Sequence, residues 1–228
     1  ERLARSAVRI EVTQKWGADM LVHVFETTMT YTIYGNGDVR LSTTFKPLTK
    51  LPFLPRLGIQ MLLPEAMDRV MWYGLGPHEN YPDMHDSALL GKYAAQVPDM
   101  HEPYERPQEN GARGGTRIVS LNNQIGGGFM AIYEQGYGDG FSFSAHDYTD
   151  QALTEAEHTP ELEGCGMTVL NIDYRQGGLG SNICGPEPQE QYKLFLTDLV
   201  TLTILLKPYN RQLGEMVAYS KRRAGGAR

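Results

Sequence analysis

Hydrophobic and polar residues alternate along much of this chain, and the alternation predicts many short β-strands. Strands are expected at residues 7–12, 21–34, 39–45, 56–63, 67–73, 116–122, 128–133, 141–145, 167–173 and 192–206. Gly35-Asn36-Gly37-Asp38 separates two of them, and its Asn-Gly pair suits the positive φ angles of a tight turn. We therefore expect residues 21–34 and 39–46 to form an antiparallel hairpin.

Only two segments have the pattern of a helix, residues 88–95 and 149–157. In the second, Thr149 or Asp150 is a suitable N-cap and Leu153 is the expected inward anchor. Many strands joined by loops rich in glycine and proline are typical of a large antiparallel sandwich of two curved sheets. We expect one all-β domain over residues 1–208 and a solvated C-terminal tail over residues 209–228.

Composition narrows the classes of partner. The formal net charge of −6 and the pI near 5.5 argue against nucleic acids and anionic membranes, and favour neutral substrates. No segment reaches the about 18 apolar residues of a membrane span. The six histidines lack zinc-site spacing, and Cys165 and Cys184 alone leave the redox compartment open, although we favour a cytoplasmic location.

The segment Trp72-Tyr73-Gly74-Leu75-Gly76-Pro77-His78-Glu79-Asn80-Tyr81-Pro82-Asp83 carries the most chemistry. Its glycines and prolines limit where the backbone bends, and the four residues His78, Glu79, Asn80 and Tyr81 supply donors, acceptors and a flat ring. The segment is either a binding loop or a well-capped connection between strands. The polar loops near residues 74–93, 98–115 and 176–191 are expected to cluster as a rim.

Five motifs in order resemble a known family. They are Leu54-Pro55-Arg56-Leu57-Gly58, the segment from Trp72 to Asp83, Arg106-Pro107-Gln108-Glu109-Asn110-Gly111, Leu170-Asn171-Ile172-Asp173, and Gly178-Leu179-Gly180-Ser181-Asn182 with Cys184-Gly185-Pro186. With them the chain resembles, over roughly residues 30–208, the C-terminal domain of the large multidomain bacterial β-galactosidases. The resemblance implies an all-β supersandwich of the galactose mutarotase-like type, whose first strands are missing before Glu1.

The resemblance also implies that catalysis and pocket formation belong to different domains of the enzyme. The two catalytic carboxylates of the retaining mechanism belong to a separate barrel domain. This chain would therefore shape the pocket for a terminal β-galactoside and support assembly, without hydrolysis by itself and without catalytic residues of its own. The implied partners are a galactoside, the remaining domains or a large subunit, and further copies of the enzyme.

Individual residues acquire roles through the same resemblance. Gly76 matches the hinge of a mobile loop that also carries His78, Asn80 and Tyr81. Glu79 matches a position near an accessory Mg²⁺ site of the complete enzyme, and the alternative is that it caps backbone amides in its own loop. Cys184 replaces an aromatic residue that stacks on the sugar, and Asn182 is a suitable hydroxyl partner.

The motif at residues 106–111 has two possible roles. Arg106, Gln108, Glu109 and Asn110 form either a polar network that braces two loops or a substrate contact, and we favour bracing.

Two other functions remain open. An aldose 1-epimerase (mutarotase) would need a histidine acid and a glutamate base, for which His78 or His146 with Glu109 are the candidates. A non-catalytic carbohydrate-binding module would need exposed aromatic rings such as those of Tyr81 or Tyr104.

Overall fold

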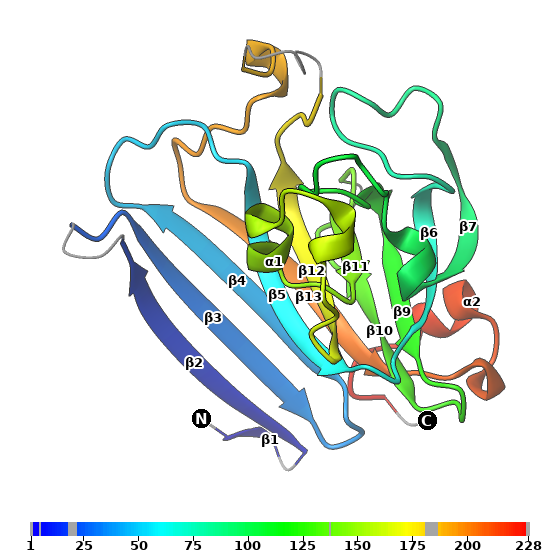
Figure 1. Cartoon of the computed structure of the whole chain (residues 1–228). Helices are drawn as coiled ribbons and strands as arrows, with labels where there is room; N and C mark the ends of the chain where they lie inside the picture. The colour runs from blue at the N-terminus through cyan, green and yellow to red at the C-terminus, as the bar shows by residue number, and fades with distance from the viewer. Residues whose placement is uncertain (1, 5, 18–21, 137, 181–186, 227–228) are drawn as a thin grey trace.

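Two antiparallel β-sheets pack face to face in the computed structural model, which describes residues 2–4, 6–17, 22–136, 138–180 and 187–226 (Figure 1). The larger sheet has the order β1-β2-β3-β4-β13-β10-β9-β6-β7 and the smaller has the order β5-β12-β11-β8. The strands are β1 (Arg2–Ala4), β2 (Ala7–Trp16), β3 (Phe25–Tyr34), β4 (Val39–Pro47), β5 (Arg56–Pro64), β6 (Arg69–Gly76), β7 (Leu89–Gln96), β8 (Arg113–Thr116), β9 (Ile118–Asn122), β10 (Gly128–Tyr133), β11 (Phe141–His146), β12 (Met167–Gln176) and β13 (Val200–Pro208). The predicted all-β antiparallel sandwich is confirmed.

Helical segments are short. They are α1 (Asp150–Glu155), α2 (Met216–Ser220) and 3₁₀ turns at Val97–Met100, Thr159–Glu161, Glu190–Tyr192 and Arg211–Leu213. The predicted start of α1 is confirmed, because the Thr149 hydroxyl accepts a hydrogen bond from the Ala152 amide and Leu153 is buried. Within the described residues, no helix is long and apolar enough to cross a membrane.

The predicted hairpin is confirmed as β3 and β4. Ile33 faces Val39, and the Asn36 side chain accepts a hydrogen bond from the Asp38 amide at 3.0 Å. Gly37 has a φ of +88°, which a residue with a side chain rarely adopts. The turn therefore sets the register of the first large hairpin.

The main core lies between the two sheets. Trp72 on β6 and Leu121 on β9 meet Phe143 on β11 and Ile172 on β12, and all four are buried. The Trp72 and Phe143 rings pack edge to face with centroids 5.8 Å apart. Alternate residues on the same small-sheet strands point to its outer face, which carries the polar residues of the candidate site.

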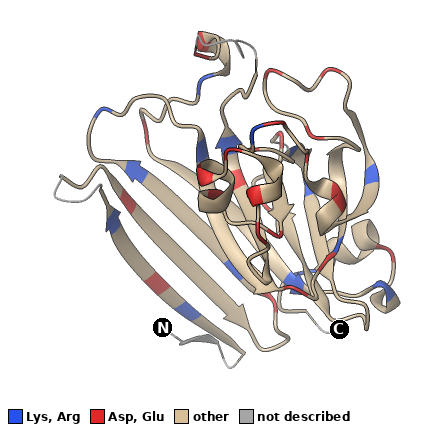
Figure 2. Cartoon of the chain, in the orientation of Figure 1, with Lys and Arg blue, Asp and Glu red and all other residues tan. Residues whose placement is uncertain are grey.

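One end of the larger sheet extends past the smaller one. We call this part, strands β1–β3, the wing (Figure 1). Along β2, the four apolar side chains Val8, Ile10, Val12 and Trp16 share the face that continues the core surface of β4, but all are exposed. Acidic and basic residues are interspersed over the ribbon, and most of β3 and β4 carries no charge (Figure 2).

The predicted helix at residues 88–95 is wrong. This segment is strand β7, which pairs with β6 from Gly76↔Leu89 to Arg69↔Gln96. Its alanines favour a helix, but the neighbouring strand supplies backbone partners, and pairing overrides a weak intrinsic preference. The strand predicted at residues 192–206 begins only at Val200, because residues 190–192 form a 3₁₀ turn.

The C-terminal segment packs on the larger sheet instead of being a solvated tail. Tyr209, Met216 and Tyr219 are buried against Ile118 and Met130, on the face opposite the main core. The buried pair Lys207–Asp38, with Nζ and Oδ2 2.8 Å apart, and the Gly225 amide bonded to Asp38 tie the segment to the first hairpin. The side chains of Lys221, Arg222 and Arg223 are exposed, as expected.

Candidate functional site

The loop after β6 is fixed in place by Asn80. The Asn80 amide donates to the Ala112 carbonyl, and its side-chain oxygen accepts from the Gly114 amide, both at 2.8 Å. Its side-chain nitrogen donates to the His78 carbonyl. Asn80 is buried, so these bonds join the loop firmly to β8. His78 itself is exposed, with Nε2 3.0 Å from the Ser87 hydroxyl.

Gly76 precedes this loop. Close packing, and not the hinge that we predicted, accounts for a glycine at this position. A side chain there would meet the rings of Tyr93 and Trp72 at 2.9–3.1 Å. Its φ lies outside the left-handed region, so close packing against two rings requires the glycine. A hinge motion at Gly76 remains a prediction.

Glu79 acts as a brace inside the protein. One carboxylate oxygen accepts a hydrogen bond from the Tyr104 hydroxyl, and the other accepts from the Gly111 amide at 2.7 Å. The side chain is buried, and the described residues contain no group of three or more histidines, cysteines or acidic residues placed to hold a metal ion. Glu79 therefore caps a backbone amide, but the amide lies on another loop and not in its own loop as the alternative had it. The Mg²⁺ role stays a prediction.

Tyr81 links the loop to the outer face of the smaller sheet. Its hydroxyl donates to Glu109 at 3.3 Å and accepts from the Ala112 amide at 3.4 Å. Burial, with the charges of Glu109 and Glu79, raises the pKa of Tyr81 well above its usual value. Since the side chain is only 3% exposed, the idea of Tyr81 as an open stacking platform is wrong.

A cavity of about 480 Å³ opens beside the loop. The loop supplies one wall and the residues around β8 and β11 supply the other. The lining residues are Leu75, Asn80, Tyr81, Pro82, His85, Leu90, Gly114, Gly115, Arg117, Asp139, Gly140, Phe141, Ser142 and Arg175. This volume suits a small sugar-sized ligand.

A second loop meets the first through Asp83. Its two carboxylate oxygens accept hydrogen bonds from the amides of Leu179 and Gly180, at 3.0 and 2.9 Å. The predicted clustering of these two loops is therefore confirmed up to Gly180. The predicted site residues Asn182 and Cys184 lie outside the described residues.

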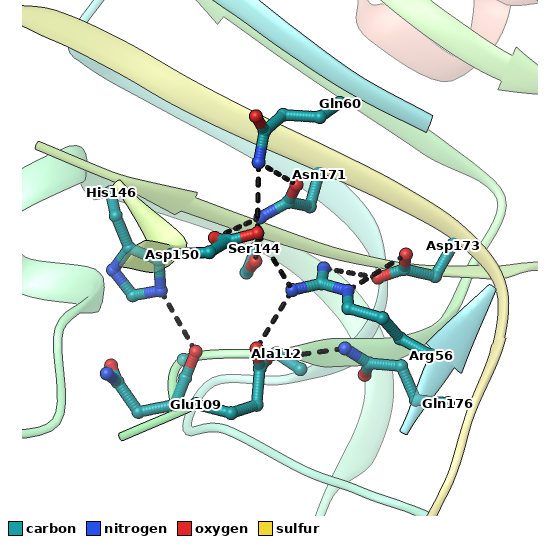
Figure 3. Close-up of polar contacts among 12 residues, drawn as sticks. Arg56, Gln60, Glu109, Ala112, Ser144, His146, Asp150, Asn171, Asp173 and Gln176 are labelled. Carbon is teal, nitrogen blue, oxygen red and sulfur yellow. Dashed lines mark hydrogen bonds and ion pairs between the residues drawn. The ribbon is translucent and has the colours of Figure 1, made fainter. Parts of the chain in front are cut away.

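Arg56 is the centre of a polar network on the outer face of the smaller sheet (Figure 3). Its guanidinium donates two hydrogen bonds to Asp173, at 2.6 and 3.2 Å, and one to Glu109 at 2.8 Å. Asp150 lies 3.9 Å away. Burial alone would lower the pKa of Arg56, but Asp173 and Glu109 reverse this and raise it. Arg56 therefore stays charged and holds the two carboxylates together.

Amides extend the network along the same face. Gln60 donates to both Asn171 and Asp150 at 3.0 Å, and Gln176 donates to Glu109 at 3.4 Å (Figure 3). Desolvation raises the pKa of Glu109 to about 7; Asp173 and Asp150 add to the shift, and Arg56 opposes it. Glu109 therefore titrates near neutral pH.

His146 is not placed to act as an acid. It is buried, and its Nε2 lies 2.9 Å from the Asn110 carbonyl, to which it donates (Figure 3). Burial lowers the pKa of His146 to about 4, so the ring is neutral near pH 7. Within the described residues, no hydrogen bond or ion pair joins Glu109 to either His78 or His146, the two histidines of the epimerase hypothesis.

The bracing predicted for residues 106–110 is only partly right. Asn110 bonds to the Glu102 amide, the Gln108 carbonyl and His146, and Glu109 bonds to Arg56. The side chains of Arg106 and Gln108 are exposed and have no hydrogen bond or ion pair within the described residues, so their assignment to the network is wrong.

Sequence reasoning missed the arginine at the centre of the network and its buried carboxylate partner. Arg56 and Asp173 stood inside the quoted motifs, but no role was given to them. Their signal was the alternation of polar Arg56 and Gln60 with apolar neighbours on one strand, and of Asn171 and Asp173 on another. Two strands with polar residues on the same side indicate a polar sheet face.

The fold and the site define an all-β sandwich domain with a braced polar loop beside a sugar-sized cavity. The family described as β-galactosidase small chain matches residues 2–206, and the chain belongs to this family. It is 36% identical over 164 residues to the β-galactosidase of Actinobacillus pleuropneumoniae, and 38% identical over 176 residues to that of Vibrio cholerae. These alignments cover 72% and 73% of this chain, which spans only 15% and 16% of those relatives.

Solved structures give a weaker likeness. A galactose mutarotase related enzyme from Lactobacillus acidophilus aligns with 92% of this chain and 70% of its own, at 8% identity and a TM-score of 0.38. A homologue of aldose epimerases from C. elegans reaches a TM-score of 0.35. Scores below 0.5 do not establish a common fold, so the mutarotase-like type of sandwich remains an interpretation.

Proposed function

We propose that this chain is the part of a β-galactosidase that forms one side of the pocket for a terminal β-galactoside, with the catalytic carboxylates in another part of the enzyme. The single observation that carries the proposal is the loop of residues 77–85, which is rich in sugar-binding chemistry and yet fixed by buried bonds of Glu79 and Asn80 beside an open cavity. Membership of the β-galactosidase small-chain family supplies the class of substrate.

The buried carboxylates next to the loop support a non-catalytic role. A retaining glycosidase needs one carboxyl group as acid and one as nucleophile, both reaching the sugar. Here Glu79 binds the Gly111 amide and the Tyr104 hydroxyl, while Asp173 and Glu109 share Arg56. These groups hold loops together, and the proposed catalytic pair lies elsewhere in the enzyme.

A chimeric enzyme tests this function. The segment of the Vibrio cholerae β-galactosidase that matches this chain is replaced by the chain, and hydrolysis of an aryl β-galactoside is measured. We expect turnover by the chimera and none by the chain alone. In the chimera, His78→Ala should raise KM several-fold, because His78 is exposed on the loop, whereas Arg106→Ala is the matched surface control. Turnover by the purified chain, or equal KM values for the two variants, would contradict the proposal.

We also propose that the wing and the free edge of β5 dock against the remaining polypeptide of the enzyme. A groove of about 470 Å³ runs between them, lined by Trp16, Phe25 and Met29 on the wing side and by Leu57 and Ile59 on β5. Among the described strands β5 pairs only with β12, so within this part of the chain its other edge offers unpaired backbone groups. The occupant that fits is an extended strand with alternating apolar side chains.

The length of the relatives favours their own remaining polypeptide as that occupant, because this chain spans only about 15% of them. In the chimera, Trp16→Lys should lower the inactivation temperature, whereas Thr13→Lys on the opposite face of β2 should not. Equal inactivation temperatures would refute this docking. Light scattering of the chain alone checks the other occupant, since a stable dimer through the wing would point to a second copy.

A further inference from the structure

The cavity beside the loop contains two arginines that the proposed function does not use. Arg117 follows β8 and Arg175 lies near the end of β12, and both line the cavity together with loop residues such as His85. Both are partly buried in a chain whose formal net charge is −6. Two cationic side chains in one cavity of an acidic protein suggest a functional role for the pair.

Both guanidinium groups are held in place by neutral partners. Arg117 donates to the Gly115 carbonyl at 3.0 Å and lies 6.0 Å from the Tyr73 ring centroid. Arg175 donates to the carbonyls of Gly140 and Tyr174, at 3.1 and 2.9 Å, and lies 5.1 Å from the Tyr174 ring centroid. A guanidinium has five N–H donors, so each retains donors beyond these bonds. The two groups are positioned but not neutralised by these contacts.

One carboxylate shares the cavity. Asp139 lies 3.6 Å from Arg175, but its side chain is 94% exposed, so water screens the pair strongly. His85 lies 3.9 Å from Asp86 and both are at the surface. Within the described lining, two arginines therefore face one well-solvated carboxylate, and the local field favours an anion.

The rest of the lining suits a compact ring. Leu75, Leu90 and Phe141 supply apolar surface, while Asn80 and Ser142 supply polar groups. About 480 Å³ exceeds what a bare inorganic anion needs and accommodates a monosaccharide. A phosphate or carboxylate attached to a sugar ring can use the arginines and the apolar wall at the same time.

We propose that this cavity binds an anionic monosaccharide, with its phosphate or carboxylate on Arg117 and Arg175. The cavity is the one beside the loop that also supports the pocket-forming role proposed above, and its two arginines add the chemical class of ligand that the site favours. Binding at the site is measured alone and does not depend on hydrolysis, so either proposal can fail without the other.

Calorimetric titration of the 228-residue chain tests the site. The probes are galactose 6-phosphate, galacturonate, galactose and inorganic phosphate. Galactose 6-phosphate or galacturonate should bind at least roughly tenfold more tightly than galactose or inorganic phosphate, and the affinity should fall as salt is added. The anionic sugar that binds identifies whether the site prefers phosphate or carboxylate.

Variants make the test specific. Arg117→Gln and Arg175→Gln should each weaken binding of the anionic sugar by roughly tenfold, whereas Asp139→Asn should strengthen it, because the competing carboxylate loses its charge. Arg106→Gln removes an exposed arginine that is not part of the lining and should leave the affinity unchanged. Thermal unfolding of each variant checks that it is folded. Equal binding of galactose and the anionic sugars, inorganic phosphate binding as tightly as they do, or unchanged affinity in both arginine variants would overturn the proposal.

Discussion

Strands β9 and β2 belong to the same sheet, but their surroundings differ completely. Every residue of β9 is buried, because the smaller sheet covers one face and the C-terminal segment covers the other. Along β2, nine of the ten residues are exposed and the first is intermediate, although apolar residues alternate there as well. Alternation therefore predicts a strand and its two faces, but the layers that cover each face depend on distant parts of the chain.

The two tryptophans should show the largest difference in stability between the core and the wing. Trp72 is 1% exposed in the core, whereas Trp16 is 53% exposed on the wing. Trp72→Ala should lower the free energy of unfolding by about 3–5 kcal/mol, since it leaves a large cavity. Trp16→Ala should cost less, about 1–2 kcal/mol, because roughly half of the residue is already exposed and one hydrogen bond to Thr27 is lost. Urea denaturation measures both, and similar losses would mean that the wing is covered in solution.

Two asparagines that make similar bonds give a smaller contrast. Asn80 is buried and Asn123 bonds to the Gly127 amide at 2.7 Å in an exposed turn. Asn80→Ala should destabilise the protein by about 1–3 kcal/mol, because buried backbone groups lose their partners. Asn123→Ala should cost less than about 1 kcal/mol, since water replaces the lost bond. Hydrogen exchange at the Gly114 amide should accelerate only in the first variant; if it does not, Asn80 does not brace the loop.

The smallest expected effect concerns pH. The pKa of Glu109 is raised to about 7 in the folded chain from an ordinary value near 4.5, so the folded state binds the proton more tightly than the unfolded state. The associated stability is complete below about pH 4.5 and is lost as the pH rises through about 7. The loss is about 1 kcal/mol after allowing for screening, because the side chain is 34% exposed.

Glu109→Gln should flatten this part of the stability curve. Glu11→Gln on the wing is the matched control, since that side chain is 56% exposed. Denaturation between pH 5 and pH 8 measures the slope. An unchanged slope in the Glu109 variant would assign the pH dependence to another group.

Sequence alone predicted the sheet architecture well because alternation and turn chemistry are local. The Asn36-Gly37 turn and the Thr149 cap needed only neighbouring residues, and both are confirmed. Residues 88–95 failed because the partner that makes them a strand lies on β6, outside the segment.

The site was harder to predict for the same reason. His78 and Tyr81 look alike as loop residues, yet one is exposed and the other is buried against Glu109. Arg56 gains its role from Asp173 and Glu109, which are distant in the sequence. Contacts of this kind follow from the packing of two sheets and a loop, which no local pattern contains.

The buried pair of Lys207 and Asp38 has a consequence for proteolysis. Asp38 also accepts a hydrogen bond from the Gly225 amide, so the segment around Gly225 acts as a latch on the first hairpin. A protease that cut after Pro208 would leave every described strand intact but would release the latch and uncover Ile118 and Met130. The nicked chain would then be prone to self-association through a face that the intact chain keeps dry.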